Sequence, residues 1–368
     1  MIHNEMRKHG IKLVLGYTVE GFKEKDNGVE VLMKDNPSLQ ADMVVLAIGV
    51  TPDTVLAKEA GLELGIKESI VVNDRMETSV PDIYAAGDAV QVKHYVTGND
   101  ALISLAGPAN KQGRIIADNI CGGDSRYLGS QGSSVIKVFD MTAATTGINE
   151  TNAQKSGLEV DTVILSPMSH AGYYSGGKVM TMKVIFEKES YRLLGAQIIG
   201  YEGVDKRIDV LATAIHAGLN ATQLKDLDLA YAPPYSSAKD PVNMAGFMID
   251  NIAKGTLKQW HLEDMDKISK DKDVVLLDVR TVGEFSRGHI DGFKNIPVDE
   301  LRERISEIEK GKPVYLICQS GLRSYIASRI LEGNGYETYN FSGGFRFYDA
   351  VVNDRALIER AYACGMDY

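Results

Sequence analysis

The sequence predicts an α/β fold with several domains, and three observations support that prediction. The chain has 368 residues, whereas one domain commonly holds about 100–200. Continuous apolar runs at residues 43–48 and 313–317 are typical of strands that are buried on both faces of a parallel sheet. Strand-like and helix-like patterns alternate between these runs, from about residue 133 to residue 252. We therefore expect two or three domains that combine helices and strands.

The composition excludes several classes of function. The formal net charge is −10, so the chain lacks the basic surface of a nucleic-acid-binding protein. No apolar run approaches the length that spans a bilayer, and no signal peptide opens the sequence. The three cysteines, Cys121, Cys318 and Cys364, lie too far apart to form a disulfide framework. We expect a reduced, cytoplasmic protein that binds neither nucleic acids nor membranes.

The N-terminal segment has the pattern of the end of a βαβ unit. A predicted helix ends at Gly10, a residue type that readily takes the left-handed conformation of a helix cap. Residues 11–15 are expected to form a strand, and residues 17–25 and 29–34 a hairpin across Asp26-Asn27-Gly28. Because a parallel sheet does not normally begin with a helix, we expect the strand before this helix to be missing from the chain.

Residues 78–88 form a motif that ends in small residues and one carboxylate. We expect a short strand that begins at Thr78 and ends in Ala86, Gly87 and Asp88. Small residues let a ligand approach the backbone closely, and a carboxylate at the end of a strand can accept hydrogen bonds from sugar hydroxyls. The structural alternative is that Asp88 caps the segment that follows, and the two roles are compatible.

This motif, together with residues 46–52, resembles the second flavin-binding segment of the FAD-dependent pyridine nucleotide-disulfide oxidoreductases. The resemblance implies that Asp88 binds the ribityl or pyrophosphate part of FAD. It also implies that Thr78, Ala86 and Gly87 lie beside the same cofactor.

Other parts of that family's pattern are missing. The family carries two glycine-rich loops, one for FAD and one for NAD(P)H, and a redox cysteine. The sequence contains no Gly-x-Gly-x-x-Gly motif. Cys121 follows a predicted helix and does not match the redox cysteine, so we interpret it as incidental. We therefore expect a truncated member that lacks roughly the first half of the reductase.

Residues 128–254 are expected to form an α+β domain. Strands are predicted at residues 135–139, 161–165, 178–187 and 193–200, and helices at residues 149–157 and 208–218. This order is similar to the C-terminal interface domain of the same oxidoreductases, which pairs two subunits. The resemblance implies a homodimer.

Two aromatic segments of this domain are similar to those of coenzyme A-disulfide reductases. The first contains Tyr173 and Tyr174, and the second contains Tyr231 and Lys239. The resemblance implies that Tyr231 packs near the flavin of the opposite subunit and that Lys239 meets the phosphates of coenzyme A. It places Tyr173 or Tyr174 in the substrate channel, and Asn110 at a position that faces the substrate. Ordinary interface packing of the tyrosines and a solvated lysine are the alternatives.

A cysteine lies where the strand predicted at residues 313–317 leads into a helix. Cys318 opens this loop, which continues through Gln319, Ser320, Gly321, Leu322, Arg323 and Ser324. The backbone N–H groups of the loop, the helix N-terminus and Arg323 all favour a negative charge and hence a thiolate. The same setting can hold a persulfide or another small anion. A buried structural cysteine is the alternative.

The loop resembles that of the rhodanese family of sulfurtransferases. Agreeing segments lie at residues 277–280, 284–285, 288–290, 295–297 and 342–345. The resemblance implies that Cys318 takes a sulfane sulfur as a persulfide and passes it to a nucleophilic acceptor. Tyrosine-phosphatase-like enzymes have a histidine before the cysteine and one more residue before the arginine. Ile317, and the four residues between Cys318 and Arg323, therefore favour a single sulfur atom over a phosphoryl group.

The whole chain is similar to a coenzyme A-disulfide reductase, or NADH-dependent persulfide reductase, that carries a C-terminal rhodanese domain. We expect partial nucleotide-binding α/β domains at residues 1–65 (NAD(P)H) and 66–127 (FAD), the dimerisation domain at 128–254 and an α/β rhodanese domain at 262–358. Trp260 is expected to pack the rhodanese domain onto its neighbour. His261 and His289 have no partners at metal-ligand spacing, so we expect no metal site.

Three functions remain open from the sequence. The first is sulfur transfer through Cys318 between small-molecule sulfur donors and thiol acceptors. The second is reduction of disulfides, persulfides or polysulfides with FAD, NAD(P)H and coenzyme A, and we favour this function coupled to the first. The third is a non-catalytic sulfur carrier with a vestigial reductase half. Cys364 could resolve a persulfide on Cys318, but we interpret it as a passive thiol.

Overall fold

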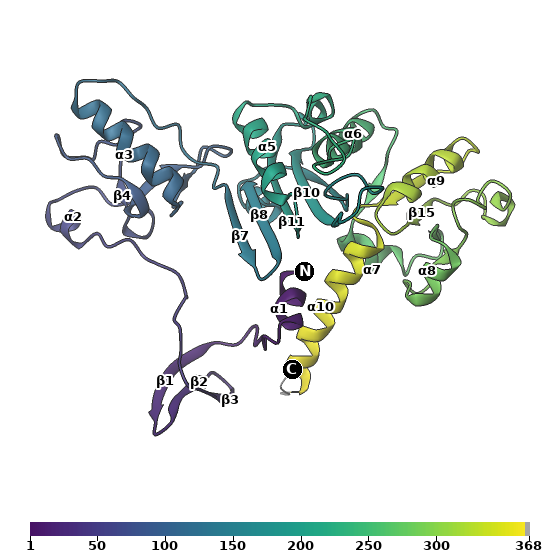
Figure 1. Ribbon diagram of the computed structural model, residues 1–368, viewed down its shortest axis with the longest axis horizontal. Coiled ribbons are helices and arrows are strands. Elements are labelled where there is room, and N and C mark those ends of the chain that lie inside the picture. Colours follow the sequence, from purple (N-terminus) through teal and green to yellow (C-terminus); the bar gives the residue numbers. More distant parts are fainter. Residues whose placement is uncertain (365–368) are drawn as a thin grey trace. The chain divides into compact units, whose positions relative to one another are not determined.

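The computed structural model describes residues 1–364, with side chains as far as Ile358 (Figure 1). The chain divides into two compact units. One comprises Met1–Glu5 and Ser133–Asn353, and the other comprises Met6–Gly132 with the described residues from Asp354 onward. Helices α1 (Ile2–Lys8) and α10 (Gly344–Cys364) contribute residues to both units. In the part of the chain that the structure describes, no helix has the length and apolar character needed to cross a membrane.

A three-stranded antiparallel sheet near the N-terminus confirms the predicted hairpin. Strands β1 (Val19–Lys25) and β2 (Gly28–Met33) form the hairpin, and β3 (Asn36–Ala41) pairs with the other edge of β2. Gly28 has a φ of 125°, and a Cβ at this position would collide with the carbonyl group of Ala41. Glycine therefore permits both the turn and the close approach of β3.

The prediction of a buried strand at residues 43–48 is wrong. These residues lie in an irregular segment, where Val45 is 76% exposed and Ile48 is 91% exposed. A strand that is buried on both faces needs partner strands for its backbone and helices over its side chains. Among the described residues no strand pairs with this segment, so its apolar side chains stay uncovered.

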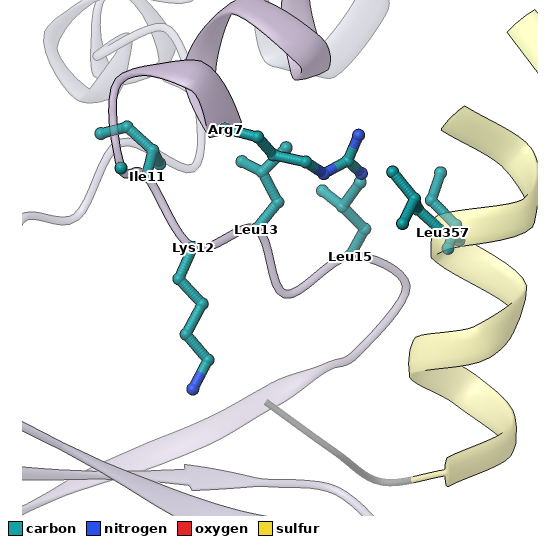
Figure 2. A pocket seen from close by; sticks show the side chains of 8 residues that line it. Arg7, Ile11, Lys12, Leu13, Leu15 and Leu357 are labelled. Atoms are coloured by element: carbon teal, nitrogen blue, oxygen red, sulfur yellow. The ribbon is translucent and has the colours of Figure 1, made fainter. Parts of the chain in front are cut away.

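The prediction of a strand at residues 11–15 is also wrong. This segment has no ladder partner among residues 1–364 and runs as irregular chain close to helix α10. Leu13 and Leu15 face Leu357 of α10, and Arg7 reaches toward the same side chain (Figure 2). These residues line a pocket of about 340 Å³. The apolar side chains of the segment are thus used against a helix and not in a sheet.

The rest of this unit forms around a small sheet of order β4–β5–β6. The strands are β4 (Ile70–Val71), β5 (Val90–Lys93) and β6 (Asp100–Ala101), the helices are α2 (Val55–Glu59) and α3 (Ala106–Ile120), and the 3-10 turns are η1 (Ile66–Glu68) and η2 (Gly87–Ala89). Met76, Val90 and Val92 are buried at its centre, with apolar side chains of α3 against them. This core places the start of α3 beside η2.

The prediction of a short strand at residues 78–88 is wrong, because these residues form turns. The chain turns at Pro81 and Asp82, and Asp82 has a φ of 64°. The N–H of Thr78 donates to the carbonyl of Ile83 over 2.9 Å across this turn. Proline has no N–H group for a strand ladder, which explains why a turn replaces the strand. The small residues and the carboxylate of the motif then lie in η2, directly before β5.

The larger unit contains a five-stranded antiparallel sheet of order β7–β8–β11–β10–β9. Its strands are β7 (Ser134–Val138), β8 (Met141–Gly147), β9 (Val160–Leu165), β10 (Met180–Glu187) and β11 (Leu193–Gly200). Its helices are α4 (Glu150–Lys155), α5 (Val204–His216) and α6 (Pro241–Ala253), with the 3-10 turn η3 (Ala221–Asp226). The predicted strands and helices of this region are confirmed. Ile208, Leu211 and Ile215 form the buried face of α5, as their helical spacing predicts.

The same unit contains a second, parallel sheet of order β12–β16–β15–β13–β14. Its strands are β12 (Gln259–Trp260), β13 (Val275–Asp278), β14 (Lys294–Asn295), β15 (Val314–Ile317) and β16 (Thr338–Phe341). Around it lie α7 (Met265–Ile268), α8 (Val282–Arg287), α9 (Leu322–Glu332) and α10, with the 3-10 turns η4 (Leu262–Asp264) and η5 (Ile305–Glu307). Two separate apolar clusters cover this sheet, as expected for a parallel sheet.

The tryptophan packs differently from the prediction. Trp260 is 2% exposed and lies inside the core of the parallel-sheet domain, where its ring contacts Phe293, Tyr315 and Phe341. Its side chain therefore stabilises this domain from within and does not join the domain to its neighbour. An aromatic residue in a strand that pairs with β16 is drawn into the apolar cluster on that face.

Polar contacts instead join the two sheets of the larger unit. Gln259 donates to the carbonyl of Thr162 over 2.7 Å, and His261 Nε2 lies 3.1 Å from a carboxylate oxygen of Asp161. The N–H of Ile164 donates to Ser342 Oγ over 3.1 Å. Because these partners all belong to β9, the edge strand of the antiparallel sheet is the element on which the parallel-sheet domain docks.

Candidate functional site

The Cys318 loop is built from the end of β15 and the start of α9. The Sγ atom of Cys318 receives the backbone N–H of Gly321 and the hydroxyl of Ser324, each over 3.2 Å. Gly321 has a φ of 98°, which lets its N–H turn back toward the sulfur. Cys318 is 0% exposed. Two donors on a buried sulfur stabilise a negative charge there, which is the chemical requirement for a nucleophilic thiol.

The loop is held from its other side by the start of α10. The N–H of Phe345 donates to the carbonyl of Cys318 over 2.7 Å, and the N–H of Arg346 donates to the carbonyl of Gln319 over 3.2 Å. Gly344 has a φ of 67°, and a Cβ there would lie 2.7 Å from the backbone nitrogen of Ser320. The loop conformation therefore depends on a glycine at this point of α10.

A buried asparagine adds a further support. Asn340, 3% exposed on β16, donates to the carbonyl of Gly321 over 3.2 Å. This bond orients the peptide group next to the one whose N–H meets the sulfur. Sequence reasoning missed Asn340, because nothing in its strand pattern marks it as a partner of a loop nineteen residues earlier.

Arg323, which we expect to favour a negative charge on Cys318, is itself paired with a carboxylate. Its guanidinium forms two hydrogen bonds of 2.7 Å to the two carboxylate oxygens of Glu284 on α8. These bonds lower the pKa of Glu284 to about 2. Burial acts in the opposite direction and raises this pKa, whereas the hydrogen bonds from Thr281 lower it further. The pKa of Arg323 is raised, first by Glu284 and then by the charge that Cys318 can carry. Arg323 is thus close enough to Cys318 to interact electrostatically, but a carboxylate neutralises it.

A second arginine near the site is also neutralised. Arg280 is 1% exposed and pairs with Asp278, with an Nη2 to Oδ2 distance of 2.7 Å. Its guanidinium lies 3.8 Å from the ring centre of Phe345 and donates to the carbonyl of Gly288. Arg280 therefore joins the end of β13 to the start of α10, and so supports the loop through that helix.

The two aromatic segments of the antiparallel-sheet domain meet at a pocket of about 610 Å³. The hydroxyls of Tyr173 and Tyr231 lie 2.6 Å apart, although the two side chains are 78% and 44% exposed. Tyr174 packs edge-on against His170, with ring centres 5.6 Å apart. Tyr231 and His170 line the pocket, so the structure brings the two predicted segments together.

A buried arginine explains why these segments meet. Arg207 of α5 is 1% exposed, and its Nη2 donates to the carbonyl groups of Ser169 and Tyr235 over 2.9 and 3.3 Å. The same guanidinium contacts Asp240 at 3.1 Å and Ser236 at 3.1 Å. The guanidinium of Arg207 thus binds both aromatic segments and holds them together. Sequence analysis did not indicate Arg207, because in the sequence it is one of several charged residues at the start of a regular helix.

The remaining predicted substrate residues are not among those that line this pocket. Lys239 is exposed, beside the N-terminus of α6, and is not among the residues that line the pocket. Asn110 belongs to the other unit, on α3, where its amide donates to the carbonyl of Ala106 over 2.9 Å. Cys121 is exposed at the end of α3, and the side chain of Cys364 lies outside the described residues.

The residues predicted for the flavin form an open, small-residue turn. Gly87 has a φ of 82°, and its N–H donates over 2.7 Å to the buried side chain of Gln112 on α3. A Cβ on Gly87 would meet nothing closer than Ala109 at 3.9 Å, so the backbone is open to a ligand. Asp88 is exposed, and α3 begins without a side-chain cap. A free helix N-terminus beside a small-residue turn fits the phosphate end of a dinucleotide. Gln112 is a further residue that the sequence did not indicate.

Comparisons with known families divide the chain into three parts. Residues 1–113 match the pyridine nucleotide-disulphide oxidoreductases, and residues 133–241 match the dimerisation domain of the pyridine nucleotide-disulphide oxidoreductases. Residues 261–350 match the rhodanese-like domain. The antiparallel sheet is therefore the dimerisation domain, and the parallel sheet with Cys318 is the rhodanese-like domain.

Three individual proteins are similar to this chain. The CoA-dependent NAD(P)H sulfur oxidoreductase of Pyrococcus abyssi is 36% identical over 242 residues, which are 66% of this chain and 54% of that protein. The reduced CoADR-RHD of Bacillus anthracis has a TM-score of 0.93 and 46% identity, over 96% of this chain and 63% of that one. The NAD-dependent persulfide reductase of A. fulgidus has a TM-score of 0.86 and 40% identity, over 94% and 63%. This chain spans about half the length of the curated relatives that it matches.

Proposed function

We propose that this chain serves the reduction of sulfur compounds, because residues 1–113 and 133–241 match domains of the pyridine nucleotide-disulphide oxidoreductases and residues 261–350 match the rhodanese-like domain. The substrates are disulfides, persulfides or polysulfides that involve coenzyme A, and the reductant is NAD(P)H through FAD. The observation that carries this proposal is the Cys318 sulfur with its two donors, Gly321 and Ser324, in a chain with oxidoreductase segments. The matches at residues 1–241 favour this function over a stand-alone sulfurtransferase.

Cys318 performs the sulfur-transfer step. Its thiolate attacks the outer sulfur of a sulfane donor, a new S–S bond forms, and the donor's own S–S bond breaks. The electron pair of the broken bond leaves with the donor fragment, sulfite in the case of thiosulfate. The N–H of Gly321 and the hydroxyl of Ser324 stabilise the sulfur while it carries charge. A nucleophilic acceptor such as a thiolate then takes the outer sulfur and restores the Cys318 thiolate.

The η2 turn is the proposed part of the flavin site. Asp88 accepts hydrogen bonds from the ribityl or pyrophosphate part of FAD, and Ala86 and Gly87 let the cofactor approach the backbone. Thr78 lies at the start of the same motif and Gln112 fixes the turn from α3. When bound, FAD supplies the electron transfer between NAD(P)H and sulfur.

The pocket at which the two aromatic segments meet, lined by Tyr231 and His170, is the proposed surface that faces coenzyme A and the flavin in a homodimer. Tyr231 packs near the flavin of the opposite subunit, and Tyr173 or Tyr174 lines the path of the substrate. Lys239 meets the coenzyme A phosphates, and Asn110 faces the substrate from α3. Dimerisation through the matched domain supports this arrangement, and a cytoplasmic setting would keep the thiols reduced.

Two measurements on the 368-residue protein test the proposed function. The first is transfer of sulfur from thiosulfate to coenzyme A, which should be lost in Cys318→Ser and kept in Cys121→Ser, since Cys121 is exposed on α3. Equal activity of the two variants would contradict a role for Cys318. The second is the visible absorption spectrum before and after dithionite. A band that bleaches would support the flavin site, and a colourless protein after addition of FAD would contradict it.

A further inference from the structure

The charges around Cys318 are unusual for a site that binds anions. Arg323 lies in the first turn of α9, and both of its Nη atoms donate to the carboxylate of Glu284 at 2.7 Å. Arg280 is likewise paired with Asp278. Arg346 touches the loop only through its backbone N–H, which donates to the carbonyl of Gln319. The donors that reach the sulfur are therefore neutral.

Glu284 takes part in two interactions, which share its Oε2 atom but depend differently on its charge. One contact is the ion pair with Arg323. The other is a capping box, in which Glu284 accepts from the N–H and the hydroxyl of Thr281 at the start of α8, over 3.0 and 2.8 Å. Glutamine serves in a capping box as well as glutamate does. A Glu284→Gln change therefore keeps the helix start through its amide oxygen, while it removes the charge and replaces one acceptor for Arg323 with an N–H donor.

We propose that Glu284 is a specificity-determining residue of the sulfur-transfer loop. By neutralising Arg323, it lowers the reactivity of Cys318 toward dianionic sulfane donors relative to donors of lower charge. This proposal rests on the proposed sulfur transfer by Cys318. The effect of Glu284 on the electrostatic potential at the Cys318 sulfur can nevertheless be measured without that activity. Glu284 acts through Arg323 and is a positioning residue, because it does not touch the sulfur.

The direct test uses two alkylating reagents that differ by one charge. Iodoacetate and iodoacetamide both form an S–C bond with the Cys318 thiolate and release iodide. The ratio of their rates, read by mass spectrometry of the peptide that contains Cys318, reports the local potential and cancels general changes in exposure. In Glu284→Gln the ratio of iodoacetate to iodoacetamide rates should rise about five-fold, because one more positive charge near the sulfur is uncompensated.

A matched control comes from the same domain. Glu300 pairs with Arg304 at 2.8 Å on the surface, and Glu300→Gln removes the same charge from a different ion pair. It should leave the ratio unchanged. Both variants keep Arg346, so its charge cancels in the comparison. If Glu284→Gln and Glu300→Gln give the same ratio as the wild type, the proposal is overturned.

The second measurement uses sulfur donors. Thiosulfate carries two negative charges and methanethiosulfonate carries one, and both give a Cys318 persulfide by the same attack, with sulfite or methanesulfinate as leaving group. Cyanide then takes the outer sulfur as thiocyanate. The kcat/KM ratio of thiosulfate to methanethiosulfonate should rise about five-fold in Glu284→Gln, mainly through KM. A merely structural role would lower both values together and leave the ratio constant, which contradicts the proposal. A wild-type protein inactive with both donors would overturn the proposed function, whereas the alkylation ratio would still decide the role of Glu284.

Discussion

The hydroxyl of Ser324 lies 3.2 Å from Sγ of Cys318, one helical turn into α9, and both atoms are buried. This contact places a neutral donor on the sulfur from the element that follows the loop. The N–H of Gly321 provides the other donor at the same distance. The two contacts make the start of α9 the part of the fold that prepares Cys318 for chemistry.

Ser324→Ala should slow sulfur transfer about ten-fold, because the charged sulfur loses one of its two donors. The measurement is the rate of thiosulfate sulfur transfer to a thiol at saturating acceptor. Ser328→Ala is the matched control, since Ser328 is equally buried on α9 but donates to the carbonyl of Tyr325 over 2.7 Å. Equal losses in the two variants would show that the hydroxyl of Ser324 has only a packing role.

Gly344→Ala should destabilise the rhodanese-like domain by about 2–3 kcal/mol, because its φ of 67° disfavours a side chain and the new Cβ would overlap the Cys318 loop. Gly335→Ala is the control, since Gly335 has a φ of 83° but faces open space. It should cost only about 1 kcal/mol. Urea unfolding followed by the fluorescence of the buried Trp260 measures both. The prediction fails if the two variants unfold at the same urea concentration.

Arg207→Met should destabilise the dimerisation domain by about 3–5 kcal/mol, because it leaves the buried Asp240 without its cation and frees the two aromatic segments. Lys206→Met is the control. Lys206 lies 3.9 Å from the same carboxylate but is partly exposed, so its loss should cost less than about 1 kcal/mol. The midpoints of thermal unfolding, followed by circular dichroism, distinguish the two variants. Similar midpoints for both variants would contradict the role given to Arg207.

The Arg323–Glu284 pair makes stability depend on pH in acid. The pKa of Glu284 is lowered from 4.5 to about 2 in the folded chain, chiefly by Arg323. A lowered pKa means that the unfolded state binds the proton first. The stabilisation is therefore fully present above pH 4.5 and is lost as the pH falls toward 2. With partial exposure of both side chains we expect it to amount to about 2 kcal/mol.

The comparison of wild type with Glu284→Gln measures this contribution. Its unfolding free energy should lie below that of the wild type at pH 7, and the difference should vanish as acid protonates Glu284. A difference that stays constant from pH 7 to below 4 would show that the charge of Glu284 is not involved.

Local patterns predicted much of the fold correctly. The Asp26-Asn27-Gly28 turn specifies its hairpin, and the strand and helix periods of the dimerisation domain match β7, β9, β10, β11, α4 and α5, whereas β8 was not predicted. The errors at residues 11–15 and 43–48 have one physical cause. An apolar run predicts burial, but whether it becomes a strand depends on a partner strand, and none of the described strands pairs with either run.

The candidate site could be predicted only where it is contiguous in sequence. Cys318, Gly321 and Ser324 are neighbours in one loop, and their pattern predicts a thiol at a helix N-terminus. The partners Glu284 and Asn340 come from other elements, and only the parallel sheet brings them to the loop. Arg323 shows the limit most clearly, since its loop position predicts a positive charge near the thiol but does not indicate that Glu284 pairs with it.

The mass of the Cys318 peptide, measured after the protein is incubated with thiosulfate and digested without reductant, shows whether Cys318 carries sulfur. We predict the added mass of one sulfur atom on that peptide, its removal by a thiol acceptor, and no such addition in Cys318→Ser. An unmodified Cys318 peptide, or sulfur found on the exposed Cys121 alone, would contradict it.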